Sequence, residues 1–155
     1  MKHWLICGAI LAAVLLSGEK AAGTDIGKLE PARVLLIESQ GGAVAVSTDA
    51  GHWGLGEDLT YAVDDMQHSA SGVVFLDTVE YLLLSPSAVN RFEEVSALLR
   101  NSCQLCLVYG VEDLEAAGDY LAIHQPGITV GDCRKNTCVL PVLYMEGDRM
   151  KLAYP

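Results

Sequence analysis

The stretch VVFLDTVEYLLL, residues 73–84, decides the fold. It is almost uniformly apolar and rich in β-branched and aromatic side chains, which is typical of a strand in the interior of a sheet. Asp77, Thr78 and Glu80 interrupt it, so we expect a bend or bulge near Asp77. Asp77 has two interpretations: a carboxyl group whose pKa is perturbed by apolar surroundings, or a bulge residue that hydrogen-bonds nearby backbone.

Helix and strand patterns alternate after this stretch. Ser85 and Pro86 are typical of a helix start, with Ser85 as N-cap and Pro86 at the first helical position, and apolar residues follow at helical spacing. Residues 105–110 (LCLVYG) then predict a short buried strand. Residues 112–125 predict a further helix, because the proline that follows them cannot continue it.

Two β-type runs precede the stretch. Residues 33–39 (RVLLIES) and 43–49 (AVAVSTD) flank the short segment QGG. This arrangement predicts an antiparallel hairpin. Because side chains alternate between the faces of a strand, we expect Val44 and Val46 to share one face of the hairpin.

The segment AGHWGLG, residues 50–56, predicts a glycine-rich connecting loop. Its glycine spacing matches neither the dinucleotide-binding nor the phosphate-loop pattern. Glu57 and Asp58 follow it and suit the positive end of a helix dipole, so a helix is expected to begin there. His52 and Trp53 in this loop are candidates for a surface contact patch.

The C-terminal part is rich in β-type residues. Pieces around residues 128–130 and 137–144 precede a turn at residues 146–148, and residues 150–154 complete a closing hairpin. Together these elements predict an α/β (α+β) fold, in which a mixed β-sheet carries two to three packing helices between an opening and a closing β-hairpin. Crossovers between parallel strands are expected to be right-handed.

The N-terminal region has the pattern of an export signal. A basic start precedes an apolar run of 13 residues, 4–16, which is shorter than the roughly 20 residues that cross a bilayer as a helix. We therefore expect residues 1–18 to be a signal peptide or short membrane anchor, residues 19–32 a linker, and residues 33–155 a single α/β domain. The protein is thus expected to be extracytoplasmic, either secreted or tethered by an uncleaved N-terminal segment.

The charge balance restricts the partners. The chain has 10 basic and 20 acidic side chains, and 51% of its residues are hydrophobic, which suits a packed globule. An acidic surface is repelled by nucleic acid and by anionic lipid head groups. We therefore expect a protein partner at the membrane and no nucleic acid partner, and the sequence does not determine whether a small-molecule ligand binds.

Four cysteines form two close pairs in the expected domain, Cys103 with Cys106 and Cys133 with Cys138. Three interpretations remain open: a zinc site, at least one structural disulfide, or a small core residue at Cys106 with the other thiols free or half-exposed. A thioredoxin-like motif is disfavoured, because such a motif opens a helix after a strand and this one enters a strand.

No assembled catalytic constellation is visible in the sequence. It contains no G-x-S-x-G or H-E-x-x-H motif and no pair of carboxylates at a defined spacing. His68 and His124 are each expected near the end of a helix, where the helix dipole alone favours an imidazole. We therefore predict no catalytic, cofactor-binding or metal-binding residues.

The order of these features resembles the N-terminal domain of the Ger(x)C-type spore germination lipoproteins. The likeness is carried by LLSG at the end of the leader, the helix pattern GEDLTYAVDDM, the stretch FLDTVEYLLLS, the helix pattern AVNRFEEVSALLR and the strand LCLVYG. The lipid-bearing cysteine of that family is replaced by Glu19. The resemblance implies a non-enzymatic domain outside the cytoplasm of a sporulating bacterium, assembling with membrane receptor subunits, and it assigns no functional residues.

These observations lead to two hypotheses of function. The first is a non-catalytic extracytoplasmic binding or assembly module, associated with spore or germination membrane complexes. The alternative is a secreted or membrane-tethered enzyme or thiol redox protein that uses Cys103 and Cys106.

Overall fold

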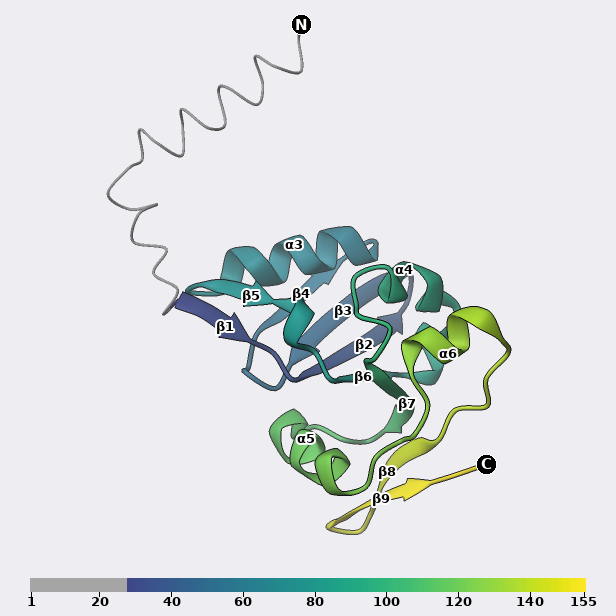
Figure 1. The fold of residues 1–155 in the computed structure, drawn as a ribbon. Coiled ribbons are helices and arrows are strands. Elements are labelled where there is room, and N and C mark those ends of the chain that lie inside the picture. The colour runs from purple at the N-terminus through teal and green to yellow at the C-terminus, as the bar shows by residue number, and fades with distance from the viewer. Residues whose placement is uncertain (1–27) are drawn as a thin grey trace, which may run out of the picture.

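The computed structural model describes residues 28–155, so the expected signal peptide and most of the expected linker lie outside the described residues. Figure 1 shows the arrangement of the helices and strands, and the chain also forms two 3-10 turns, η2 and η3. In chain order the elements are β1 (Leu29–Pro31), β2 (Val34–Gln40), β3 (Ala43–Thr48), β4 (Trp53–Gly56), α3 (Leu59–Ser69), β5 (Val73–Phe75), η2 (Leu76–Thr78), β6 (Tyr81–Leu84), η3 (Pro86–Arg91), α4 (Phe92–Ser96), β7 (Gln104–Tyr109), α5 (Leu114–Ile123), α6 (Val130–Lys135), β8 (Val142–Glu146) and β9 (Arg149–Ala153).

A seven-stranded mixed sheet with the order β4-β3-β2-β6-β7-β8-β9 organises the described residues. Its central strands β2, β6, β7 and β8 are parallel, and an antiparallel hairpin closes each end. β1 and β5 form a second, two-stranded parallel sheet. The predicted mixed α+β fold with an opening and a closing hairpin is confirmed.

The two faces of the large sheet are covered unequally. α3, α4 and α6 lie on one side and α5 lies on the other (Figure 1). Because side chains alternate along each strand, the sheet separates two buried clusters. The first contains Leu35, Ile37, Val44, Val46 and Leu82, and the second contains Val34, Leu36, Leu83, Cys106 and Leu143. The shared face predicted for Val44 and Val46 is therefore confirmed.

The expected loop at residues 50–56 is wrong in its second half, where β4 forms an edge strand beside β3. In the sequence Gly54 and Gly56 are typical of a loop, but the close packing of β4 against α3 requires glycine at both positions. A Cβ on Gly54 would lie 2.1 Å from the carbonyl oxygen of Ala62 in α3, and one on Gly56 would lie 2.4 Å from the Ala62 nitrogen. The glycines therefore let α3 lie directly against β4. The helix itself begins as predicted, with Asp58 as its N-cap.

The apolar stretch 73–84 is divided between the two sheets. β5 pairs with β1, the 3-10 turn η2 follows, and β6 pairs with β2 and β7 in the large sheet. The predicted bend near Asp77 is confirmed. Asp77 itself is exposed in that turn, so its predicted position inside an apolar strand is wrong.

The expected helix after Ser85 is shorter and tighter than predicted. Pro86 begins the 3-10 segment η3, and the α-helix α4 that follows ends at Ser96. Ser85 makes no side-chain capping bond in the structure. A second correction concerns the β-type piece at residues 128–130, because Val130 begins α6 and only Thr129 makes an isolated bridge, to Gln104.

Candidate binding face on the uncovered half of the sheet

Three strands of the large sheet present a face that no helix covers among the described residues. Ala43, Ala45 and Ser47 on β3 point away from the buried Val44 and Val46. Trp53 and Leu55 on β4 point the same way, since register pairs Trp53 with Ser47 and Leu55 with Ala45. Glu38 and Gln40 continue this surface on β2, opposite Ala45 and Ala43. We call these seven residues the open sheet face.

Two large apolar side chains stand on this face. Trp53 is 62% exposed and Leu55 is 54% exposed. Both lie on the edge strand β4, beside the small side chains of Ala43, Ala45 and Ser47. The face therefore has large exposed apolar side chains along its edge strand and small side chains next to them.

The small side chains leave two shallow depressions in this face. The larger has a volume of about 770 Å³ and is lined by Glu38, Ser39, Gln40, Ala43, Ala45, Leu55, Ser85 and Ser87. The smaller, of about 420 Å³, is lined by Ser47, Thr48, Asp49, Gly51, His52, Trp53, Glu112, Asp113, Leu114 and Glu115. Because Ala43, Ala45 and Ser47 are successive residues on one face of β3, the two depressions follow one another along that strand.

The lining of the two depressions is acidic. It contains five carboxylates and no lysine or arginine. Asp49 accepts hydrogen bonds from the backbone nitrogens of Arg33 and Val34, at 2.9 and 3.0 Å, and Asp113 caps α5. These two carboxylates are therefore structural. The other three are exposed to solvent: Glu38, Glu112 and Glu115.

Arg33 lies beside Asp49 and is already paired. The guanidinium of Arg33 lies 2.7 Å from Oδ1 of Asp119 on α5, and it is 3.9 Å from Oδ2 of Asp49. The hydrogen bond to Asp119 raises the pKa of Arg33 above its ordinary value. Arg33 therefore joins α5 to the sheet, and its ion pairs are with Asp119 and Asp49, not with Glu38, Glu112 or Glu115.

Side chains of α3 occupy the free edge of β4. The backbone nitrogen of Leu55 donates to Oδ2 of Asp65 at 2.9 Å, and the hydroxyl of Ser69 donates to the carbonyl oxygen of Trp53 at 3.1 Å. An unpaired sheet edge is a template for a further strand, and a covering helix removes that template. A partner must therefore contact this region through its face.

The two residues of the predicted contact patch, His52 and Trp53, differ in their exposure to solvent. Trp53 lies on the open sheet face, as a contact residue should. The His52 side chain is only 15% exposed, and its Nε2 lies against Oε2 of Glu30 in β1. His52 thus joins β1 to the β3–β4 turn, and it also lines the smaller depression beside Trp53.

The neighbours of Trp53 on this face were not among the residues predicted from the sequence. Leu55, Ala43, Ala45 and Glu38 were not singled out, although the alternation AVAVST carried the signal. If Val44 and Val46 point to the core, Ala43 and Ala45 must point away from it.

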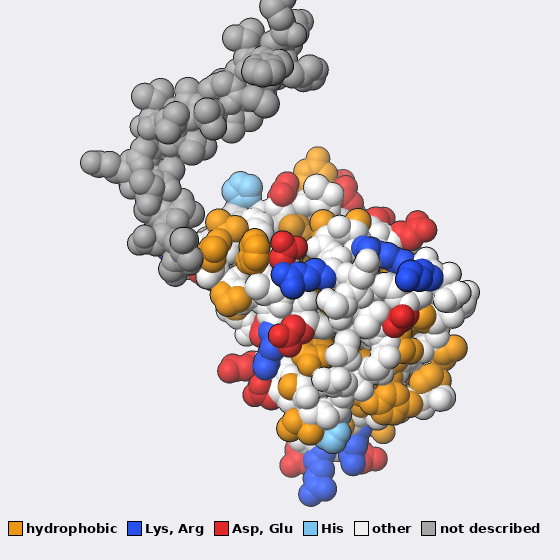
Figure 2. Space-filling model, in the orientation of Figure 1, with side chains coloured by type: hydrophobic (Ala, Val, Ile, Leu, Met, Phe, Trp, Pro, Cys, Tyr) orange, Lys and Arg blue, Asp and Glu red, His pale blue; other side chains and the backbone are white. Residues whose placement is uncertain are grey.

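A second group of exposed apolar side chains lies on the small sheet. Leu29, Val73 and Phe75 are each about two-fifths exposed, and register places Leu29 opposite Val73 and Pro31 opposite Phe75. Figure 2 shows hydrophobic side chains gathered at this end of the molecule. The open sheet face is the stronger candidate site, because it combines exposed apolar side chains with a hollow and a uniform charge.

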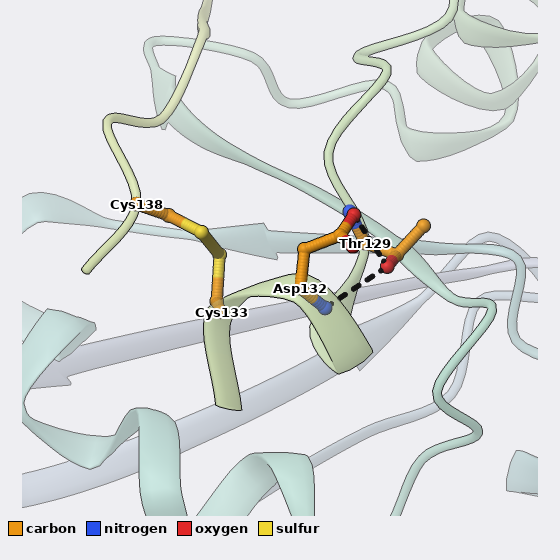
Figure 3. The surroundings of a disulfide bond; sticks show 4 residues. All are labelled: Thr129, Asp132, Cys133 and Cys138. Atoms are coloured by element: carbon orange, nitrogen blue, oxygen red, sulfur yellow. Dashed lines mark hydrogen bonds between the residues drawn. A yellow bond between two sulfur atoms is a disulfide. The ribbon is translucent and has the colours of Figure 1, made fainter. Parts of the chain in front are cut away.

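The four cysteines have separate structural roles. Cys133 in α6 and Cys138 beyond it form a disulfide (Figure 3), so the prediction of a structural disulfide is confirmed and that of free thiols is wrong for this pair. Cys103 and Cys106 are free and buried. They belong to clusters on opposite sides of the sheet, so the four sulfurs do not converge on one zinc ion.

Burial makes the two free thiols weak acids. Removal from water raises the pKa of Cys103 and of Cys106 to about 12. The thiolate is the reactive form of cysteine, so these side chains are protonated at neutral pH. Cys103 and Cys106 lie on opposite sides of the sheet and stay protonated, so they act as packing residues of the core.

Residues 28–155 contain no group of three His, Cys, Asp or Glu side chains placed to hold a metal ion. No helix in that part of the chain is long and apolar enough to span a bilayer. Comparison of the chain with protein-family models, with curated proteins and with solved structures gave no match.

Proposed function

We propose that this protein is a non-catalytic extracytoplasmic binding or assembly module, and that a protein partner binds its open sheet face. The observation that carries the proposal is the exposure of Trp53 and Leu55 beside a hollow on an uncovered face of the central sheet. Exposed aromatic anchors next to concave surface are typical of protein interfaces. Val44 and Val46 pack into the core behind β3, and β2 has buried side chains on both sides of the sheet, so the face is preorganised for binding.

The disulfide supports the extracytoplasmic part of the proposal. Disulfides persist in oxidising compartments and are rare where thiols are kept reduced. The signal-like pattern of residues 1–18 and the resemblance to Ger(x)C-type germination proteins favour the same location, with membrane receptor subunits as the class of partner. The acidic balance of the chain favours a protein partner over nucleic acid.

The alternative function, a thiol redox protein that uses Cys103 and Cys106, has a weaker basis. The two thiols lie in different cores and their pKa values are about 12. Thiol trapping under oxidising and reducing conditions decides between the two functions. A disulfide that forms and breaks between these residues would support the redox function.

Site-specific photocrosslinking in the producing cell tests the binding function. A photoreactive phenylalanine in place of Leu55 should give a discrete crosslink to a membrane-fraction protein. The matched control carries the same group at Ile123, which is 80% exposed at the end of α5, away from the open sheet face. The proposal is overturned if position 55 gives no crosslink, or if both positions give the same one.

A blocking substitution provides a second measurement. The side chain of Ala45 points into the larger depression, so Ala45→Tyr should fill the hollow without disturbing the core. We expect the position-55 crosslink to disappear in this variant while the urea midpoint of unfolding stays unchanged. An undiminished crosslink in Ala45→Tyr would contradict binding in the hollow.

A further inference from the structure

We propose that the open sheet face receives a basic amphipathic helix of the partner protein. The inference rests on the proposed function and specifies the chemistry of its partner. Three properties of the described residues carry it: the closed edge of β4, the width of the uncovered face, and the sign of its charge.

The closed edge excludes an added strand. Asp65 and Ser69 occupy the outward backbone groups of Leu55 and Trp53 on β4. A partner segment therefore has to lie across the sheet and contact it by side chains. Elements that pack on a sheet face in this way are helices or further sheets.

The width of the face fits one helix. β4, β3 and β2 are separated by two strand spacings, which together amount to about 10 Å. An α-helix with its side chains is roughly 10–12 Å across. α5 already shows this mode of packing on the same side of the sheet, where a Cβ on its Gly118 would lie 2.9 Å from Cγ2 of Val34. The partner helix would lie beside α5, over Ala43, Ala45 and Leu55.

The charge of the face selects a basic helix. Glu38 lies at the larger depression, while Glu112 and Glu115 lie at the smaller one, and neither lining contains a lysine or arginine. Lysine or arginine side chains on the flanks of a docked helix would face these carboxylates. The exposed indole of Trp53 also offers a π-face to such a cation. The apolar stripe of the helix would cover Leu55 and the alanines.

The test uses the full chain with Trp4→Phe, so that Trp53 is the one remaining tryptophan. The probe is a synthetic helical peptide of leucine and lysine, about 18 residues or ~27 Å long. A second peptide has glutamate in place of every lysine. We expect saturable quenching or a blue shift of Trp53 emission with the lysine peptide alone, and weaker binding at higher salt.

Paired charge variants separate specific docking from general attraction to an acidic protein. Glu38→Gln with Glu112→Gln should weaken binding of the lysine peptide at least about tenfold, because both carboxylates face the groove. The control, Asp64→Asn with Glu93→Gln, removes the same charge from α3 and α4 on the other side of the sheet and should leave the affinity within about twofold. Equal weakening in both pairs, or equal binding of the glutamate peptide, overturns the inference.

Failure of this inference is distinguishable from failure of the proposed function. The peptide crosslinked at position 55 in cells can be identified by mass spectrometry, and we expect it to contain lysine or arginine on both sides of an apolar stripe. A discrete crosslink to an acidic or neutral segment would overturn the basic helix while the binding function stands. Binding of the full chain to anionic phospholipid vesicles with a change in Trp53 emission would also overturn it.

Discussion

Cys103 and Cys106 show how the fold separates two thiols that the sequence places close together. The strand between them alternates its side chains, so one thiol packs with Leu105 and the other with Leu83 on opposite sides of the sheet. Burial disfavours the charged thiolate and raises both pKa values to about 12. The consequence is a measurable dependence of stability on alkaline pH.

We predict that these thiols make the free energy of unfolding fall as the pH rises above about 8.5, the ordinary pKa of cysteine. A folded pKa above the unfolded one gives stability that is fully present below the unfolded pKa and is lost as the pH rises through the folded pKa, here about 12. The loss at pH 10 should be about 2 kcal/mol for each thiol. Urea unfolding at pH 8 and pH 10 measures it.

The matched control for this prediction is the variant Cys103→Ala with Cys106→Ala. It should be less stable at pH 8, because each substitution removes a buried side chain, but its stability should change less between the two pH values. All other ionisable side chains are the same in both proteins, so the comparison isolates the two thiols. Parallel pH dependences in the two proteins would contradict the prediction.

The sequence was informative about single residues where the strand period decides the outcome. Burial of Cys106 between two leucines follows from the apolar run around it. The partner of Cys133 does not follow in this way, because four cysteines allow three pairings and only the fold chooses among them. The pairing of His52 with Glu30 likewise depends on β1 returning beside the β3–β4 turn.

At the scale of elements, the contact between β4 and α3 depends on two missing side chains. Gly54 has no left-handed backbone conformation, so its role is space alone. We predict that Gly54→Ala destabilises the protein by more than about 3 kcal/mol, because its Cβ would overlap the backbone of Ala62 and Met66. Urea unfolding with an unchanged m-value measures the loss.

Gly41→Ala is the matched control for Gly54→Ala. Gly41 has a φ of 60° in the β2–β3 turn and nothing within 4 Å of an added Cβ. This substitution should cost only about 1–2 kcal/mol, the strain of a left-handed alanine. If the two variants were equally stable, close packing would not be the reason for Gly54.

The same glycines explain why β4 was not predicted. Glycine is typical of loops, and because it has no side chain it does not contribute to the alternating pattern by which a strand is predicted. α6 was missed for a different reason, because residues 128–130 are β-type and its start depends on capping. Thr129 and Asp132 form a reciprocal capping box that fixes the first turn.

The capping box gives a prediction about the pKa of Asp132. Hydrogen bonds from the side chain and backbone of Thr129 lower the pKa of Asp132, and nearby Lys135 adds to the effect. The contribution of the carboxylate to α6 is therefore present above the ordinary pKa of aspartate, about 3.9, and is lost as the pH falls through the lower folded value. NMR titration should show this pKa rising in Thr129→Ala. An unchanged Asp132 pKa in that variant would rule out the hydrogen bond from the Thr129 hydroxyl as its cause.

The whole molecule contains features that no local pattern reveals. The hairpins at both ends of the sheet were predictable, because each joins neighbouring segments through a short turn. The order β2-β6-β7-β8 and the placement of α5 alone on one face depend on contacts between distant segments. The open sheet face is a consequence of that order, so only its tryptophan could be chosen from the sequence.

The disulfide is predicted to stabilise the molecule without being required for the fold. The two buried clusters lie against the large sheet, whereas Cys133 and Cys138 close a short loop of sequence separation 5 beside α6. Loop-closure entropy for so short a loop amounts to about 2 kcal/mol. Reduction should therefore lower the free energy of unfolding by about that amount while the circular dichroism of the native state persists. The variant Cys133→Ser with Cys138→Ser should show the same loss and no response to reductant, and collapse of native structure on reduction would show that the loop, and not the sheet, holds the fold together.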